Sequence, residues 1–236
     1  MAREATVLLA DSHPLPSVTT NGVTDVRFGR KSQPDTETTT GEPEDVTAEA
    51  PAQPRTDGPF DESQVIGDGV QRVDLGSLLI APSEGHELRL QVDEKTGAVQ
   101  SVMLAGQDGA LEVQAFAAPR NGDLWGTVRP QIQADITGRG GKAEEREGPF
   151  GTELICQVPV QKPDGTVGLQ PSRIIGVNGE RWMLRASFLG RPAVAPDEAG
   201  TWEAALAQVV VRRGAGAMPV GEPIPAILPD QARRVK

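Results

Sequence analysis

The chain has 236 residues, a formal net charge of −10 and one cysteine, Cys156. This length suffices for one domain of ordinary size with tails, and a single cysteine excludes the internal disulfides on which small secreted scaffolds depend. No apolar segment approaches the length of a membrane span, and the run Val7–Ala10 is shorter than the about 7–15 residues of a signal-peptide core, so we expect a soluble, cytoplasmic protein.

Acidic residues are concentrated before the first strand pattern. Residues 31–70 hold ten acidic side chains and two basic ones. Because residues 1–71 contain too few apolar groups to offset the entropy lost on ordering a backbone, we predict a disordered acidic leader over this range. Residues 1–25 show no pattern, and the basic-aromatic segment Val26–Lys31 follows them, which suggests that translation begins at Val26.

Alternating apolar and polar residues predict the first half of a folded domain. A short strand over Arg72–Ile80 precedes a hairpin that joins Leu88–Val92 to Val99–Leu104. A third antiparallel strand follows at Leu111–Ala115. These strands predict a meander with one buried face.

After Asp123 the apolar period changes from two residues to four, which predicts a helix that ends at Gly138. Pro130 lies inside this pattern, where a proline removes a backbone donor and costs about 3 kcal/mol. We therefore expect the helix to be kinked or to begin late. The repeating positions are Leu124, Val128, Ile132 and Ile136.

Two hairpins are predicted in the second half. A strand over Thr152–Val160 is followed by the turn sequence Pro163–Gly165. The dipeptide Asn178-Gly179 then predicts a two-residue type I′ turn between strands at Arg173–Val177 and Trp182–Phe188.

The last element is an amphipathic helix over Trp202–Val210, N-capped by Thr201. The order of meander, helix, two hairpins and helix favours an α+β domain over residues 72–214. We expect an antiparallel β-sheet of about six to seven strands covered by two main helices, because no strand alternates with a crossover helix. Residues 215–236 form a Pro-rich tail with a basic end.

Reactive side chains are few, and each has a structural interpretation. His86 lacks a catalytic partner in sequence, and Cys156 lies on the apolar face of its strand, where a thiol packs as a small hydrophobe. The segment Gly138–Lys142 lacks the spacing of a phosphate-binding loop and reads as a helix end. The charged run Glu144–Glu147 is interpreted as a solvated loop. We predict no catalytic residue, no metal ligand and no cofactor.

A candidate docking surface is the loop Gly148–Gly151. Its Pro149 and Phe150, flanked by glycines and close to Trp125, are predicted to present an apolar group outside the core. The alternative is that Phe150 tucks into the edge of the core.

Three arginines form a second candidate site. Arg181 and Arg185 share one face of a hairpin, and Arg173 is expected across from them, in an arrangement able to bind phosphates or carboxylates. With Glu145 or Glu147 such a cluster would line the pocket of an enzyme or small-ligand binder. Nucleic-acid binding is disfavoured, because residues 71–236 hold 18 basic and 20 acidic side chains and tyrosine is absent.

Four segments resemble the actinobacterial domain-of-unknown-function 3710 family: Arg72–Leu78, Leu111–Arg120, Asp123–Trp125 and above all Glu145–Leu154. Val26–Lys31 is similar to the usual start of that family. The resemblance covers about Val26 to Pro229 and implies a cytoplasmic bacterial protein, but it names no activity. The order of strands and helices is also similar to the α/β/α sandwich of PsbP-like proteins, which mostly serve as adaptors and lipoprotein modules.

The sequence therefore favours a non-catalytic protein-interaction or adaptor domain with an unknown protein partner. The alternatives are an enzyme or small-ligand binder that uses an arginine and carboxylate pocket and, third, a nucleic-acid binder.

Overall fold

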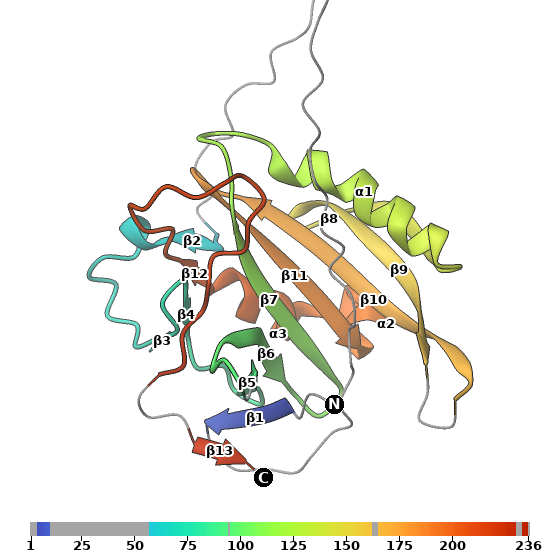
Figure 1. Ribbon diagram of the computed structural model, residues 1–236, viewed down its shortest axis with the longest axis horizontal. Helices are drawn as coiled ribbons and strands as arrows, with labels where there is room; N and C mark the ends of the chain where they lie inside the picture. The colour runs from blue at the N-terminus through green and yellow to red at the C-terminus, as the bar shows by residue number, and fades with distance from the viewer. Residues whose placement is uncertain (1–3, 10–56, 94, 162–164, 230–232, 236) are drawn as a thin grey trace, which may run out of the picture. The chain divides into compact units, whose positions relative to one another are not determined.

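A computed structural model describes residues 4–9, 57–93, 95–161, 165–229 and 233–235, all within one compact unit. Nine strands of these residues form one antiparallel sheet (Figure 1). Their bounds are β1 Glu4–Leu9, β5 Glu87–Asp93, β6 Val99–Ala105, β7 Gly109–Ala117, β8 Lys142–Gly148, β9 Gly151–Gln161, β10 Val167–Asn178, β11 Trp182–Gly190 and β13 Arg233–Val235. Across the sheet the order is β13–β1–β5–β6–β7–β11–β10–β9–β8.

A second sheet is built from four short strands. They are β2 Phe60–Asp61, β3 Val73–Asp74, β4 Leu78–Ile80 and β12 Val210–Val211, in the order β2–β12–β4–β3. The strand predicted over Arg72–Ile80 is therefore a tight hairpin of β3 and β4. The chain reverses at Gly76, whose φ of 76° suits a residue without a Cβ.

The helices are α1 Leu124–Gly138, α2 Arg191–Val194 and α3 Gly200–Ala207, with 3₁₀ turns η1 Glu62–Gln64 and η2 Pro196–Glu198. The predicted helix after Asp123 is confirmed, and the Asp123 side chain caps it by accepting a hydrogen bond of 2.7 Å from Gly126 N. It does not begin late, because it starts at Leu124 and continues through Pro130, which lies on its exposed side.

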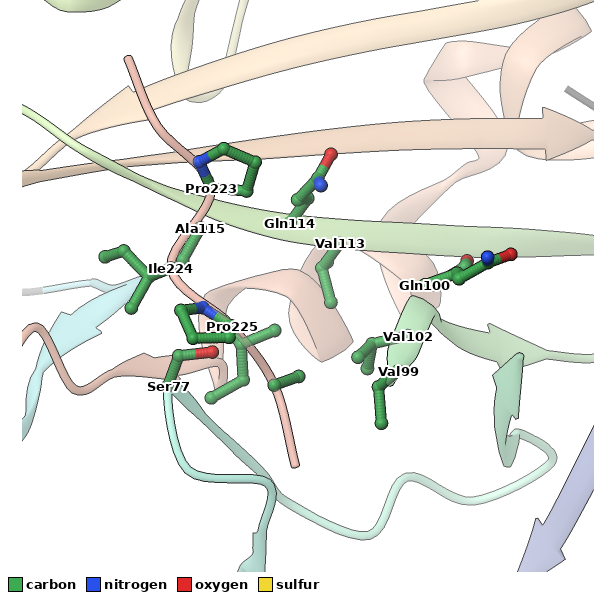
Figure 2. Close-up of a pocket in the computed structure, with 13 residues that line it drawn as sticks. Ser77, Val99, Gln100, Val102, Val113, Gln114, Ala115, Pro223, Ile224 and Pro225 are labelled. Atoms are coloured by element: carbon green, nitrogen blue, oxygen red, sulfur yellow. The ribbon is translucent and has the colours of Figure 1, made fainter. Parts of the chain in front are cut away.

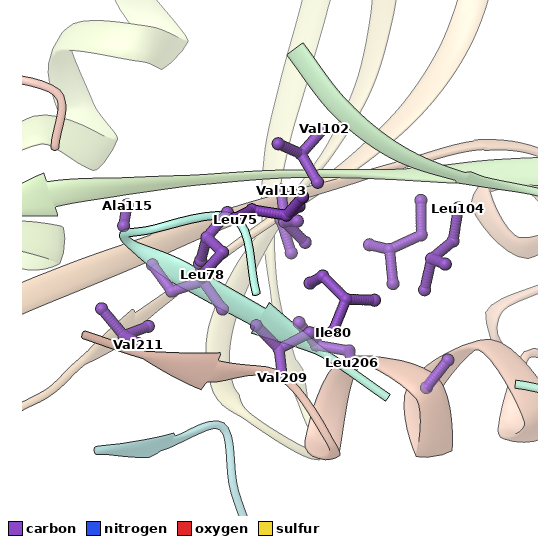
Figure 3. Packing of buried hydrophobic residues seen from close by; sticks show 14 of the residues in the cluster. Leu75, Leu78, Ile80, Val102, Leu104, Val113, Ala115, Leu206, Val209 and Val211 are labelled. Carbon is purple, nitrogen blue, oxygen red and sulfur yellow. The ribbon is translucent and has the colours of Figure 1, made fainter. Parts of the chain in front are cut away.

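Two clusters of buried apolar side chains lie on opposite faces of the main sheet. Successive residues of a strand point to opposite faces, and Ile174 belongs to one cluster whereas Ile175 belongs to the other. The smaller cluster contains Trp125 of α1. The larger contains Leu206 of α3 and, as Figure 3 shows, Ile80 of β4 packed nearby. Helix α1 thus packs on one face, and α3 together with the small sheet packs on the other.

The Asn178-Gly179 hairpin joins β10 to β11 as predicted, but the prediction of a two-residue turn at these residues is wrong. Strand β10 ends at Asn178 and β11 begins at Trp182, which leaves the three residues 179–181 in the loop. Gly179 is required for a different reason, because a Cβ there would lie 2.1 Å from an indole carbon of Trp182. Its close approach to a side chain, rather than a left-handed backbone, selects glycine.

Helix α3 is shorter than the amphipathic pattern indicated. It ends at Ala207 and its N-cap position is Ala199 rather than Thr201. The next apolar residues, Val210 and Val211, form β12 in the small sheet. Sequence periodicity could not separate a helix of eight residues from the buried strand that follows it.

The acidic run Glu144–Glu147 is part of a strand and not a loop. Strand β8 pairs with β9 along its whole length, from Lys142 with Gln157 to Gly148 with Gly151. Only Ala143 of this strand is buried, so its residues show no alternation of apolar and polar side chains. Backbone pairing with β9 makes the segment a strand.

The folded body extends beyond residues 72–214 at both ends. Before Arg72, Phe60 N donates to Val209 O at 2.9 Å and β2 pairs in parallel with β12. After Gly214, Ile224 N donates to Ala115 O at 2.8 Å, which continues the main sheet beside β7. Strand β1 also lies within the range predicted as leader. The predicted disorder of residues 10–56 and the Val26 start lie outside the described residues.

Candidate functional site

The three arginines singled out in the sequence do not form one cluster. Arg173 pairs across the ladder with Phe188, a member of the larger buried cluster, and it therefore faces α3. Arg185 pairs with Gln114 on the opposite face of the sheet, and Arg181 lies in the loop before β11. The strand register decides this separation.

Arg173 lies in a buried ion network. Its guanidinium contacts Glu153 at 2.8 Å and Glu203 of α3 at 2.7 Å, and the side chains of Arg173 and Glu153 are fully buried. Burial alone would lower the pKa of Arg173, but hydrogen bonds to both carboxylates outweigh it and raise that pKa. Arg146 approaches Glu153 to 3.9 Å and also pairs with Asp197 at 2.9 Å. The network fastens α3 and the η2 turn to the sheet.

The other two arginines make local contacts. Arg185 Nη2 donates to Gln114 Oε1 at 2.7 Å, and its guanidinium lies 5.2 Å from the ring centroid of Phe116. Burial lowers the pKa of Arg185, and the charge of Glu112 opposes that shift. Arg181 Nη2 donates to the carbonyl of Gly214 at 3.0 Å. Each of these contacts holds neighbouring segments together.

Trp125 and Phe150 belong to different sides of the molecule. Phe150 is 8 % exposed and packs in the larger cluster, whereas Trp125 is 4 % exposed and packs in the smaller one. The indole of Trp125 donates from Nε1 to the carbonyl of Thr152 at 2.7 Å. Pro149 is exposed in the turn between β8 and β9. Of the predicted surface, only Pro149 faces solvent, and Phe150 takes the alternative place in the core.

His86 and Cys156 are packed as structural residues. The His86 ring lies 4.0 Å from the Trp202 ring, its Nδ1 is 2.8 Å from the Ser83 hydroxyl, and burial lowers its pKa. Cys156 is a buried member of the smaller cluster, and burial raises the pKa of its thiol to about 11. A thiol with that pKa stays protonated at neutral pH.

The described ranges contain neither a cluster of metal ligands nor a helix able to span a membrane. Within them no group of three or more His, Cys, Asp and Glu side chains is placed to bind a metal ion. None of the helices described combines the length and the apolar character needed to cross a bilayer.

Exposed apolar side chains occur where β9 and β10 run beyond their neighbours. We call this ribbon, residues 157–161 and 167–171, the arm; it extends at the lower right of Figure 1. Val167 is 73 % exposed and Leu169 is 54 % exposed. Sequence reasoning missed the arm, because alternation reveals which residues share a face but not whether another strand or helix covers that face.

A small groove opens where β7 changes its pairing partner. Val113 pairs with Val102 of β6, but Ala115 accepts from Ile224 of the C-terminal segment. Between the start of β6 and that segment lies a space of about 60 Å³ (Figure 2). Ser77 lines it and is 3 % exposed.

The chain was compared with known proteins, solved structures and protein families. No curated protein and no solved structure matches the chain, so the likeness to PsbP-like proteins stays a prediction. A family model described as "Protein of unknown function (DUF3710)" matches residues 58–235, which include every strand and helix described here except β1. The match begins at residue 58, just before β2, in agreement with the packing of β2 against β12. The chain therefore belongs to the DUF3710 family.

Proposed function

We propose that this domain is a non-catalytic protein-interaction module that docks a partner through the arm. The observation that carries the proposal is the exposure of Val167 and Leu169 on a projecting ribbon. Large apolar side chains gathered on one exposed surface are typical of protein contacts.

Beyond Gln157, the arm lacks neighbouring strands on both sides in the described part of the chain. Strand β8 reaches only Gln157 of β9, and β11 reaches only Ser172 of β10. A two-stranded ribbon by itself is marginally stable in water, so a bound partner would stabilise the arm.

One face of the arm is suited to packing. Leu169 pairs with Pro159, so these two side chains lie on one face, and Val167 and Pro171 share it because they are two residues from Leu169. The described arm residues include no charged side chain. The two prolines remove backbone donors, which favours side-chain packing over addition of another strand. The partner surface is therefore apolar and uncharged.

The test is site-specific crosslinking in cells. A photo-crosslinking amino acid replaces Val167, and a Leu169→Glu substitution is added in a second version. We expect a discrete adduct from Val167 that Leu169→Glu abolishes, because a carboxylate would have to be desolvated in the contact.

Val220→Glu provides the matched control, because Val220 is 58 % exposed and lies next to Gly221, whose N–H donates to Ala117 at the end of β7 away from the arm. It should leave the adduct unchanged. Absence of an adduct at Val167, or an adduct that survives Leu169→Glu, would overturn the proposal. An adduct of twice the chain mass would identify the partner as a second copy of this chain.

A further inference from the structure

We propose that the groove beside Ser77 is a binding site for one small uncharged group that carries a hydrogen-bonding function, such as a primary amide or an alcohol. This site lies apart from the arm and goes beyond the proposed docking function. Three features carry the inference: an unpartnered hydroxyl, the absence of charge from the lining, and the size of the space.

The hydroxyl of Ser77 is buried, and no hydrogen-bond partner for it occurs among the described residues. Figure 2 shows the Ser77 side chain pointing toward Pro225 at the groove. A buried hydroxyl that makes no hydrogen bond destabilises a fold by about 1–3 kcal/mol. Its oxygen has less than 1 Å² of accessible surface, so a ligand in the groove would satisfy it only after the Ser77 side chain turns toward the space.

The remaining lining is neutral. Valines 99, 102 and 113 and the segment Pro223–Ala226 supply apolar walls, and no charged side chain lines the groove. Gln100 and Gln114 complete the lining. The Gln114 side chain points to the opposite face of the sheet from Val113, where its carbonyl oxygen accepts from Arg185, so Ser77 is the polar group on the side of the apolar walls. An ion would lose its hydration here without a countercharge, which selects neutral ligands.

The space limits the size of the ligand. Its volume is about 60 Å³ on a scale where one water requires about 10–15 Å³, which corresponds to roughly four to six heavy atoms. A whole nucleotide or flavin does not fit inside it. An amide or hydroxyl group of this size does fit, and it could come from the end of a partner's Asn or Thr side chain or from a free small molecule.

The experiment is an NMR titration of the full chain labelled with ¹⁵N. The neutral probes are acetamide and propan-2-ol, and the charged probes of similar size are acetate and methylammonium. We expect saturable shifts of the Ser77, Ser101 and Ile224 amides with the neutral probes only. A capped asparagine is added as a further probe: binding shows that a peptide side chain can enter, and failure restricts the site to free molecules.

Two serine variants test the role of the hydroxyl. Ser77→Ala should weaken acetamide binding by at least about fivefold, the effect of one lost hydrogen bond. Ser172→Ala removes another buried serine, away from the groove on β10, and should leave affinity unchanged. If Ser77→Ala does not fold, the contrast between neutral and charged probes decides on its own. Equal binding of all probes, or no saturable shift with the neutral ones, overturns the proposal without affecting the test of the arm.

Discussion

The indole Nε1–H of Trp182 donates a 2.9 Å hydrogen bond to Oδ2 of Asp61, across 121 residues of sequence. Trp182 is part of the larger buried cluster, and Asp61 caps the η1 turn. Burial alone would raise the pKa of Asp61, but hydrogen bonds from Ser63 and Trp182 hold it below its ordinary value. The segment before Arg72 is therefore attached to the core and belongs to the folded body.

A chain that begins at Arg72 is expected to be much less stable than one that begins at Asp57. The shorter chain loses β2 and leaves the buried Trp182 without its carboxylate partner, and a hydrogen bond to a charged group contributes about 1.5–3 kcal/mol. Thermal unfolding of the two chains measures the difference. Equal melting temperatures would show that this attachment contributes nothing.

Arg173→Met is expected to destabilise the fold by about 3–5 kcal/mol, because it leaves the fully buried carboxylate of Glu153 without its main cation. Adding Glu153→Leu should restore part of the loss, since the uncompensated charge is then removed. Denaturant unfolding measures both changes. Glu203→Gln is the control and should have a smaller effect, because Glu203 is partly exposed. A double variant less stable than Arg173→Met would contradict the explanation.

Stability should fall at alkaline pH through Cys156. Its thiol has a pKa raised from 9.0 to about 11 by burial, so the unfolded chain loses this proton first and the native state is disfavoured as pH rises from 9.0 toward about 11. Cys156→Val should reduce this dependence in unfolding curves measured across the range. At about pH 8 only about one thiol in a thousand is ionised in the folded chain. Alkylation of Cys156 should therefore require unfolding. Rapid alkylation of the native protein would contradict the buried position.

Pro130→Ala is expected to stabilise the protein by about 1–2 kcal/mol, because alanine restores a backbone donor inside α1 and Pro130 is exposed, so little packing is lost. The melting temperature measures the effect. Gln131→Ala, also at an exposed position of α1, should stay within about 0.5 kcal/mol of the parent. A loss of stability in Pro130→Ala would mean that the helix depends on the proline at this point.

Local sequence patterns predicted most elements and the faces of their strands. The α+β class, the antiparallel sheet and the helix that follows Asp123 could be read from the alternation of apolar residues and from turn residues. The burial of Cys156 followed from its phase on β9. Strand β8 could not be predicted, because its exposed charged residues carry no apolar pattern and its pairing with β9 forms it.

The tertiary structure decided which residues meet. Alternation places Arg173 on a face of its strand, but only the register with β11 and the position of α3 bring it to Glu203 and separate it from Arg185. The exposure of the arm and the groove beside Ser77 were also decided by the tertiary structure, since both depend on how far neighbouring strands extend. A side chain's direction is a property of its own backbone, whereas its partner is set by hydrogen bonds between segments far apart in the chain.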